Sequence, residues 1–303
     1  MKNSQKKLVQ GGALDASEAG SAAQSSYCAA HEGTRCKPQG HLRHFDARAF
    51  LQQHRMAARR QSRSSVGDCM TRGLLFNFLC ALVVDAIQIS DPFLQGATRK
   101  DAFRQLVARD NMTGNAITIQ TKWLPLNGVK DLISTAVPPP LVEDADVIVF
   151  GIGAFLAERH GRAPSSAYVQ QCLDKWYSMW LRAAEERGAS IIWQEYAATH
   201  FSTPNGDVAS FHNLPGGVSC TPLSPPVLKA AEANPRLCVG NAFAASKGWP
   251  IVRTFNATVQ MADAHKPKLG GRWPDCRHFC PWVYEHIGAT RSLFGLIYAI
   301  SAS

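Results

Sequence analysis

The sequence predicts an α/β domain in which a mostly parallel sheet is covered by helices on both faces. Short apolar runs rich in β-branched residues alternate along the chain with longer segments of helical apolar spacing. Parallel strands need long crossover connections, and this alternation supplies them. With 303 residues, of which 46% are hydrophobic and 18% charged, the chain can bury the core of one large domain.

The expected elements follow from these patterns. Four strands are predicted at residues 116–120, 146–150, 190–193 and 250–254. Helices are predicted at residues 70–87, 167–187, 226–246 and 283–299, and a basic surface helix is predicted from Asp46, ending before Ser64. Gly188 should close the helix over 167–187, because glycine readily adopts the left-handed conformation found at helix ends. Residues 1–40 are expected to form a mobile or disulfide-tethered arm.

Charge and hydropathy restrict the partners. The net charge of +9 is uneven and concentrates in residues 2–7 and 55–63. Neither zinc-finger spacing nor an RNA-binding aromatic motif accompanies these segments, so nucleic-acid binding is disfavoured. An acidic polysaccharide, a membrane surface or plain solvent fits the charge equally well. The apolar run 74–84 is too short for a membrane span and is interpreted as a core helix. Residues 1–30 show no secretory signal.

A glycine turn before the apolar helix carries the first candidate for chemistry. Gly67, Asp68 and Cys69 form a turn that leads into the helix, so Cys69 lies at a helix N-terminus. The helix dipole and the free amide groups there stabilise an anion and therefore a nucleophilic thiolate. A small buried cysteine after a glycine turn is the alternative interpretation.

A second candidate lies near the C-terminus. Asp275 and His278 are three residues apart, which on a helical turn places them on one face, and an aspartate so placed can orient a histidine general base. A purely structural pair is the alternative. Asp263 and His265 form a rival pair whose spacing suits an extended or turn segment. His200 is a third candidate, interpreted as a substrate-cleft or structural residue.

Cysteine usage points to an oxidising compartment. The chain has nine cysteines, and with Cys69 set aside as a free thiol, eight remain that could form disulfides. Glycosylation sequons at Asn111 and Asn256 also favour such a compartment.

At these residues the chain resembles the plant trichome-birefringence-like polysaccharide O-acetyltransferases and the wider PC-esterase group of SGNH proteins. The likeness runs from about Arg35 to the C-terminus, and its blocks occur in family order. Residues 66–80 resemble the Gly-Asp-Ser-x-x-Arg-Asn block, with Cys69 in place of the serine and Arg72 kept. Residues 146–155 are similar to the strand-plus-glycine block. Residues 191–220 carry the His-Phe pair and a Gly-Gly-x-x-Cys ending, 263–265 match Asp-Ala-His, and 275–280 resemble Asp-Cys-x-His-Trp-Cys.

The resemblance implies a three-layer SGNH-like domain over residues 41–303, with Cys69, Asp275 and His278 as the catalytic triad. Backbone amides of Cys69 and Gly153 would form the oxyanion hole. Around Gly153, the polar and aromatic residues of the family are replaced by Gly151, Ile152, Ala154 and Phe155. Residues with a secondary or substrate role by position are Asp68, Arg72, His200, Asp263 and His265.

The resemblance also implies disulfides. Cys220 would pair with Cys276, and Cys80 or Cys280 would reach back to Cys28 or Cys36.

The expected function is transfer of an acyl group, by resemblance acetyl, to a hydroxyl of a polysaccharide or glycan in the Golgi lumen. The acetyl donor is a co-substrate of unknown identity, and no bound cofactor or metal is expected. Family members usually carry an N-terminal membrane anchor, and none is visible in this chain. An esterase of the same fold, with water as the acceptor, and a catalytically silent glycan-binding homologue are the alternatives.

Overall fold

The computed structural model describes parts of the chain and gives an α/β architecture. The described residues are 62–67, 71, 74, 87–90, 103–110, 116–123, 145–152, 156, 163–207, 219–265, 275–279, 283–284, 287–289, 292–293 and 295–296. Within them a sheet of seven strands runs in the order β2-β3-β4-β1-β5-β6-β7. The strands are β1 (Ser62–Gly67), β2 (Ile87–Ser90), β3 (Phe103–Asp110), β4 (Ala116–Trp123), β5 (Val147–Gly151), β6 (Ser190–Gln194) and β7 (Ile251–Val252).

The sheet is mostly parallel. Strands β4, β1, β5, β6 and β7 run in the same direction, and β3 and β2 join at one edge in antiparallel pairings. The four strands predicted from apolar runs are confirmed as β4, β5, β6 and β7. β3 was not predicted, because Arg104, Gln105 and Arg109 interrupt its apolar residues. β1 begins at Ser62, so the predicted basic helix cannot continue to Ser64.

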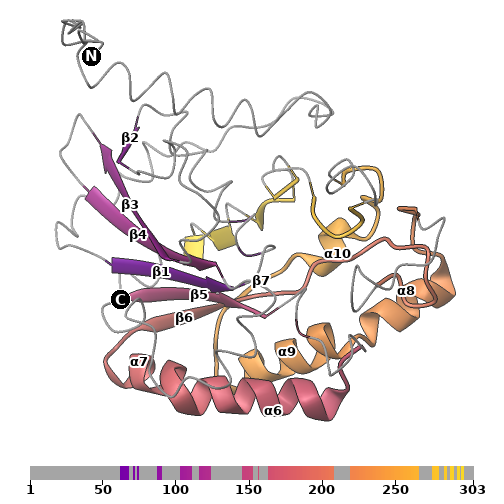
Figure 1. Cartoon of the computed structure of the whole chain (residues 1–303), viewed down its shortest axis with the longest axis horizontal. Helices are drawn as coiled ribbons and strands as arrows, with labels where there is room; N and C mark the ends of the chain where they lie inside the picture. Colours follow the sequence, from indigo (N-terminus) through magenta and orange to yellow (C-terminus); the bar gives the residue numbers. More distant parts are fainter. Residues whose placement is uncertain are drawn as a thin grey trace, which may run out of the picture.

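Helices cover one face of β5 and β6 (Figure 1). α6 (Ser166–Trp176) continues through a π-helical turn, η4 (Tyr177–Leu181), into α7 (Arg182–Glu186). These three elements together match the helix predicted over 167–187. Gly188 has a φ of 89°, as expected of the residue that closes a helix. The first turn is capped by Ser165, whose hydroxyl accepts the N–H of Tyr168 at 3.3 Å.

The single helix predicted over 226–246 is wrong, because the structure has two helices there. α8 spans Pro225–Glu232 and α9 spans Pro235–Ser246. Pro235 lacks an N–H and disfavours a helical conformation in the residue before it. Asn234 is accordingly extended, and its side chain caps α9 by accepting the N–H of Arg236 at 3.0 Å. Of the helix predicted over 70–87, Thr71 and Leu74 are helical, but Ile87 begins β2, so the helix ends earlier than predicted. Of the helix predicted over 283–299, the described residues are helical except at 287–288, which form a turn.

An aromatic core joins these helices to the sheet. Phe150 of β5 contacts four tryptophans edge to face, with ring centroids 5.5 to 6.4 Å apart: Trp176, Trp180, Trp193 and Trp249. α9 approaches β6 closely at Gly240, where a Cβ would lie 2.6 Å from the Trp193 ring. The same ring donates its indole N–H to Asn241 at 3.0 Å. This face of the sheet is therefore devoted to packing.

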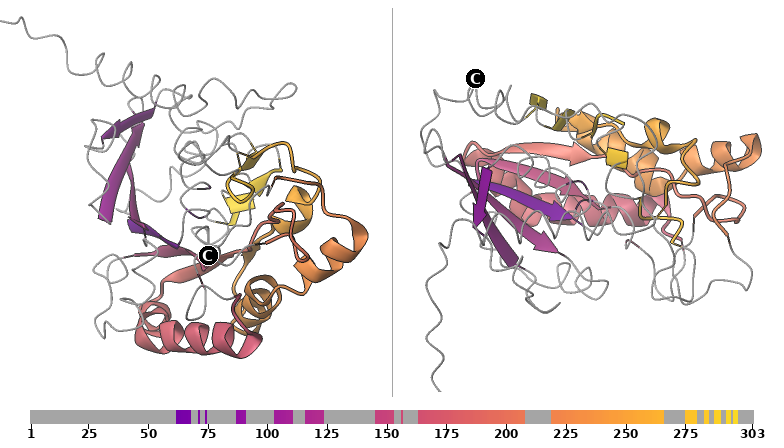
Figure 2. Two further views of the ribbon diagram at one scale, coloured as in Figure 1. Left: turned by 45° about the vertical axis from the view of Figure 1, so that its right-hand side comes forward. Right: turned by 90° about the horizontal axis from the view of Figure 1, so that it is seen from above.

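The C-terminal residues lie across the sheet from α6 and α9. Figures 1 and 2 show the described segments after residue 275, in yellow, on the side of the strands away from these helices. Thr71 also lies on this side, since its hydroxyl approaches Gly151 of β5. None of the helices in the described part of the chain is long and apolar enough to cross a membrane.

Candidate functional site

The candidate site lies at the edge where the parallel strands end. Gly67, the last residue of β1, is paired in register with Gly151, the last residue of β5. In the next strand, Gln194 ends β6 and is paired with Val252 of β7. Because these strands are parallel, the loops that follow them leave from one edge of the sheet. Cys69 follows Gly67 by two residues, so the chain leaves β1 toward Cys69 at this edge.

Asp275 and His278 form a close pair. His278 Nδ1 lies 2.7 and 2.9 Å from the two carboxylate oxygens of Asp275. A carboxylate only accepts hydrogen bonds, so the proton of this contact is on Nδ1 and the neutral ring keeps its lone pair on Nε2. The Asp275 side chain is 1% exposed and that of His278 is 14% exposed. Nε2 makes no hydrogen bond with the described residues, and a proton acceptor needs this tautomer.

The pair forms by a bend, so the helical turn expected for these residues is wrong. Residues 276–278 are bends and Phe279 is in a β-bridge with His265. The spacing still brings the side chains together, because the Asp275 carboxylate also accepts the backbone N–H of His278 at 3.0 Å. An aspartate that accepts an N–H three residues ahead closes a local turn, as at a helix N-cap.

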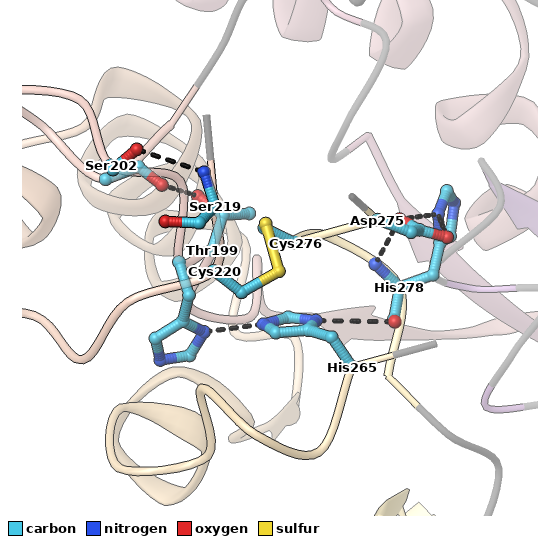
Figure 3. The surroundings of a disulfide bond; sticks show 10 residues. Thr199, Ser202, Ser219, Cys220, His265, Asp275, Cys276 and His278 are labelled. Atoms are coloured by element: carbon cyan, nitrogen blue, oxygen red, sulfur yellow. Dashed lines mark hydrogen bonds and ion pairs between the residues drawn. A yellow bond between two sulfur atoms is a disulfide. The ribbon is translucent and has the colours of Figure 1, made fainter. Parts of the chain in front are cut away.

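Several contacts fix this turn to the loops after β6 and β7. The Cys220–Cys276 disulfide, which the resemblance implied, is present. The carbonyl of Cys276 accepts the N–H of His200 at 2.9 Å. Figure 3 shows the disulfide beside the Asp275–His278 pair, and the His265 ring, which faces the His278 carbonyl at 3.3 Å. The position of the His278 imidazole is thus set by covalent and hydrogen-bonded supports on several sides.

His200 and His265 form a second, buried imidazole pair. His200 Nδ1 lies 2.7 Å from His265 Nε2, and His200 Nε2 lies 2.9 Å from the Val259 carbonyl. Burial lowers the pKa of His200, and burial together with the neighbouring His200 lowers the pKa of His265 to about 3. The pair is therefore neutral near pH 7. His200 is 0% exposed, which favours the structural interpretation over the substrate cleft.

The rival pair of Asp263 and His265 does not form. Asp263 is exposed and makes no hydrogen bond to His265, whose ring stacks on Phe279 with centroids 4.2 Å apart. Its carboxylate acts at longer range and favours the charged form of His200, partly offsetting the effect of burial. An exposed aspartate beside a buried histidine cannot orient that ring.

A buried ionic cluster that the sequence did not reveal anchors the same turn. The carboxylate of Asp207 accepts from Arg277 Nη2 at 3.2 Å and from Arg236 Nη1 at 2.6 Å. The Tyr196 hydroxyl and the Asn234 amide also donate to it, at 3.2 and 3.0 Å. Arg277 lies between Cys276 and His278, so this cluster ties the turn to α9. The only sequence signal was an arginine inside the Asp-Cys-x-His block.

Other site residues lie outside the described part of the chain. These are Asp68, Cys69, Arg72 and Gly153, together with the disulfide candidates Cys28, Cys36, Cys80 and Cys280. Two of the eight remaining cysteines are free thiols, which corrects the expectation that all eight could pair. Cys172 is a buried residue of α6, and Cys238 is exposed on α9.

The described residues define a positioned aspartate–histidine pair with an open nitrogen, which can accept a proton from a nucleophile and return it to a leaving group. No group of three or more potential metal ligands occurs among them. No protein-family model matches the sequence, and a search of the curated proteins finds no matching relative.

Proposed function

We propose that this protein transfers an acyl group, in the first instance acetyl, to a hydroxyl of a polysaccharide or glycan through a covalent acyl-enzyme on Cys69. The observation that supports this most is the Asp275–His278 pair, in which Nδ1 is held by the carboxylate and Nε2 is open. The second support is the pairing of the strands. β1 ends at Gly67, two residues before Cys69, at the edge of the sheet where β6 also ends. The loops after β6 and β7 that hold the Asp275–His278 turn leave from the same edge.

The proposed reaction has two steps. His278 Nε2 takes the proton of the Cys69 thiol, the thiolate attacks the acyl carbon, and His278 gives the proton to the leaving group of the donor. His278 then takes the proton of an acceptor hydroxyl, whose oxygen attacks the thioester and releases Cys69 as thiolate, and the proton returns to the sulfur. Backbone amides of Cys69 and Gly153 would hold the oxyanion in both steps. With water as acceptor the same steps give an esterase.

The proposal includes the setting of the reaction. Membership of the trichome-birefringence-like PC-esterase group, with a three-layer SGNH fold over 41–303, accounts for the order of the sequence blocks. Operation in the Golgi lumen is consistent with the Cys220–Cys276 disulfide, since such bonds persist in oxidising compartments. Asn256, in one of the two sequons, is exposed and is available to a glycan.

The test uses the full chain with p-nitrophenyl acetate as donor and oligosaccharides from xylan, mannan and pectin digests as acceptors. Wild type should release nitrophenol and yield acetylated sugar, and Cys69→Ala should abolish both. Cys69→Ser should retain part of the turnover, because a hydroxyl can replace the thiol when a general base is present. Cys238→Ala, which removes an exposed free thiol on α9, is the control. Equal turnover by wild type and Cys69→Ala would refute the proposal.

A catalytically silent glycan-binding protein gives a different outcome. It would bind the oligosaccharides, as measured by calorimetry, and would do so unchanged in Cys69→Ala and Cys69→Ser. It would form no acetylated sugar in any variant.

A further inference from the structure

The side-chain oxygen of Gln194, Oε1, is buried and has no hydrogen-bond partner among the described residues. Gln194 ends β6, and the residue is 3% exposed. A buried carbonyl oxygen without a donor destabilises a fold, so most such atoms in proteins are paired. Five buried side-chain atoms lack a partner in the described part of the chain, and the Gln194 oxygen is the one hydrogen-bond acceptor among them.

The adjacent residue shows how complete the pairing is elsewhere at this edge. Both oxygens of Glu195 are occupied. Oε2 accepts the backbone N–H groups of Thr254 and Phe255, each at 2.8 Å, and Oε1 accepts from Asn241 and Arg253 at 2.7 and 3.0 Å. The carboxylate of Glu195 thus joins β6 to the loop after β7, while no described residue donates to the Gln194 oxygen.

Toward β1, the next two residues in line with Gln194 have no side chains, whereas Val252 of β7 lies on its other side. The pairing of β5 with β6 runs from Val147 and Ser190 to Phe150 and Trp193, so Gly151 is next to Gln194. Gly151 is in turn paired with Gly67 of β1. A Cβ on Gly151 would lie 2.7 Å from Thr71 Oγ1 and 3.3 Å from Gln194 Cβ. Because Gly67 and Gly151 have no side chains, the Thr71 hydroxyl approaches this part of the sheet next to Gln194.

Gln194 and its neighbour Gly151 are on the face of the sheet opposite the aromatic core. Side chains alternate between the two faces of a strand, and Phe150 and Trp193 pack against α6 and α9. Gly151 and Gln194 therefore face the opposite side, where Thr71 and the C-terminal segments lie. Neighbouring strands are about 4.8 Å apart, so the Gln194 backbone is about 10 Å from that of Gly67. An extended glutamine side chain spans much of this distance.

We propose that Gln194 is a substrate-contacting residue, and that its Oε1 accepts a hydrogen bond from a hydroxyl of the acyl-acceptor sugar. This inference rests on the proposed function, because it names the contact that holds the acceptor of the same reaction. A primary amide both accepts and donates, and a sugar hydroxyl does both as well. The bound hydroxyl supplies the donor that the protein lacks. An acceptor without that hydroxyl leaves the oxygen unpaired and is discriminated against.

The test replaces Gln194 by methionine, which keeps the length of the side chain and removes its polar atoms. Because the unpaired oxygen is removed, the melting temperature of Gln194→Met should rise by roughly 2 to 4 °C. The ratio of acetyl transfer to sugar over acetyl transfer to water should fall roughly tenfold, as one hydrogen bond is lost. Gln170→Met is the matched control, because Gln170 is exposed on α6 and bonds only Asp174. It should change neither quantity.

The outcomes separate this inference from the proposed function. A lower melting temperature for Gln194→Met, or an unchanged transfer ratio, overturns the role of Gln194 even if Cys69 is acylated. If no acyl-enzyme forms in wild type, the proposed function fails and the sugar contact is tested by calorimetric binding of the same oligosaccharides. Binding that weakens roughly tenfold in Gln194→Met supports the contact, and equal binding overturns it.

Discussion

The two histidine sites of this protein are connected by one contact and are built in opposite ways. His278 is partly exposed, its Nδ1 is held by a buried carboxylate, and its Nε2 is open. His200 and His265 are buried, and within the described part of the chain they bond each other and backbone carbonyls rather than a carboxylate. When neutral, each of these two rings has one N–H proton, and the contact of His265 Nδ1 with the His278 carbonyl, at 3.3 Å, is longer than the contacts of His200 at 2.7 and 2.9 Å.

The difference shows which imidazole can do chemistry. A buried imidazole without an anionic partner is kept neutral, because charging it in a low-dielectric surrounding is unfavourable. An imidazole oriented by a carboxylate is supported when it becomes charged, and it keeps one nitrogen for a substrate. In the proposed function the two sites have different roles: His278 transfers protons, and the His200–His265 pair holds the turn in place.

The largest effect on turnover is expected when the His278 imidazole is replaced by an amide. His278→Gln should lower turnover of p-nitrophenyl acetate by about 10² to 10⁴, the usual contribution of a general base, with little change in melting temperature. His200→Gln should lower the melting temperature, because a fully buried ring is lost, with turnover per folded molecule much less affected. Steady-state kinetics on protein quantified by circular dichroism measures both. The reverse pattern would contradict the division of roles.

The next effect concerns the covalent support of the turn. The Cys220–Cys276 disulfide closes a segment with a sequence separation of 56 residues, which corresponds to about 4 kcal/mol of loop-closure entropy. A variant with both cysteines changed to alanine should lose about that much stability in urea unfolding. If the disulfide also positions His278, turnover should fall under conditions where the variant remains folded. Unchanged turnover would restrict the disulfide to a purely stabilising role.

A smaller, pH-dependent effect on stability is expected from the buried His200–His265 pair. The pKa of His265 is about 3 in the folded protein and ordinarily 6.5, so below pH 6.5 the unfolded chain binds more protons and stability falls as the pH falls toward 3. The loss over this range is on the order of 4 kcal/mol for His265 alone. The charges of Asp263, Asp275 and His278 also affect the pKa values of the pair. The informative quantity is therefore the difference in pH dependence between wild type and a variant without the pair.

The comparison is made with a variant in which both His200 and His265 are glutamine. Glutamine can keep hydrogen bonds and does not titrate in this range. Its unfolding free energy should depend less steeply on pH between about 6.5 and 3 than that of wild type. Parallel pH profiles would mean that the pair does not stay neutral in the folded protein.

The sequence predicted the core strands well, because buried parallel strands consist of short continuous apolar runs. It failed where local and tertiary effects compete. Pro235 and Asn234 divide one helical pattern into two helices, and β3 carries polar residues that hid its strand character. The Asp275–His278 contact was predicted from spacing, but with the wrong local geometry, since the same spacing fits a capped bend.

Contacts between distant segments could not be derived from the residues alone. The His200–His265 pair joins residues 65 apart, and Arg277 meets Asp207 across 70 residues. Neither spacing nor composition encodes such contacts. The Cys220–Cys276 pairing came only from the resemblance, because connectivity is not readable from one sequence.

The central claim is that the thiol of Cys69 and the imidazole of His278 act as one unit. Alkylation of Cys69 by iodoacetamide, followed by peptide mass spectrometry across pH, tests it directly in wild type and in His278→Gln. We expect wild-type Cys69 to react well below pH 8.5, the ordinary pKa of a thiol, and the midpoint to shift up toward that value in His278→Gln. Identical profiles in the two proteins would contradict the account.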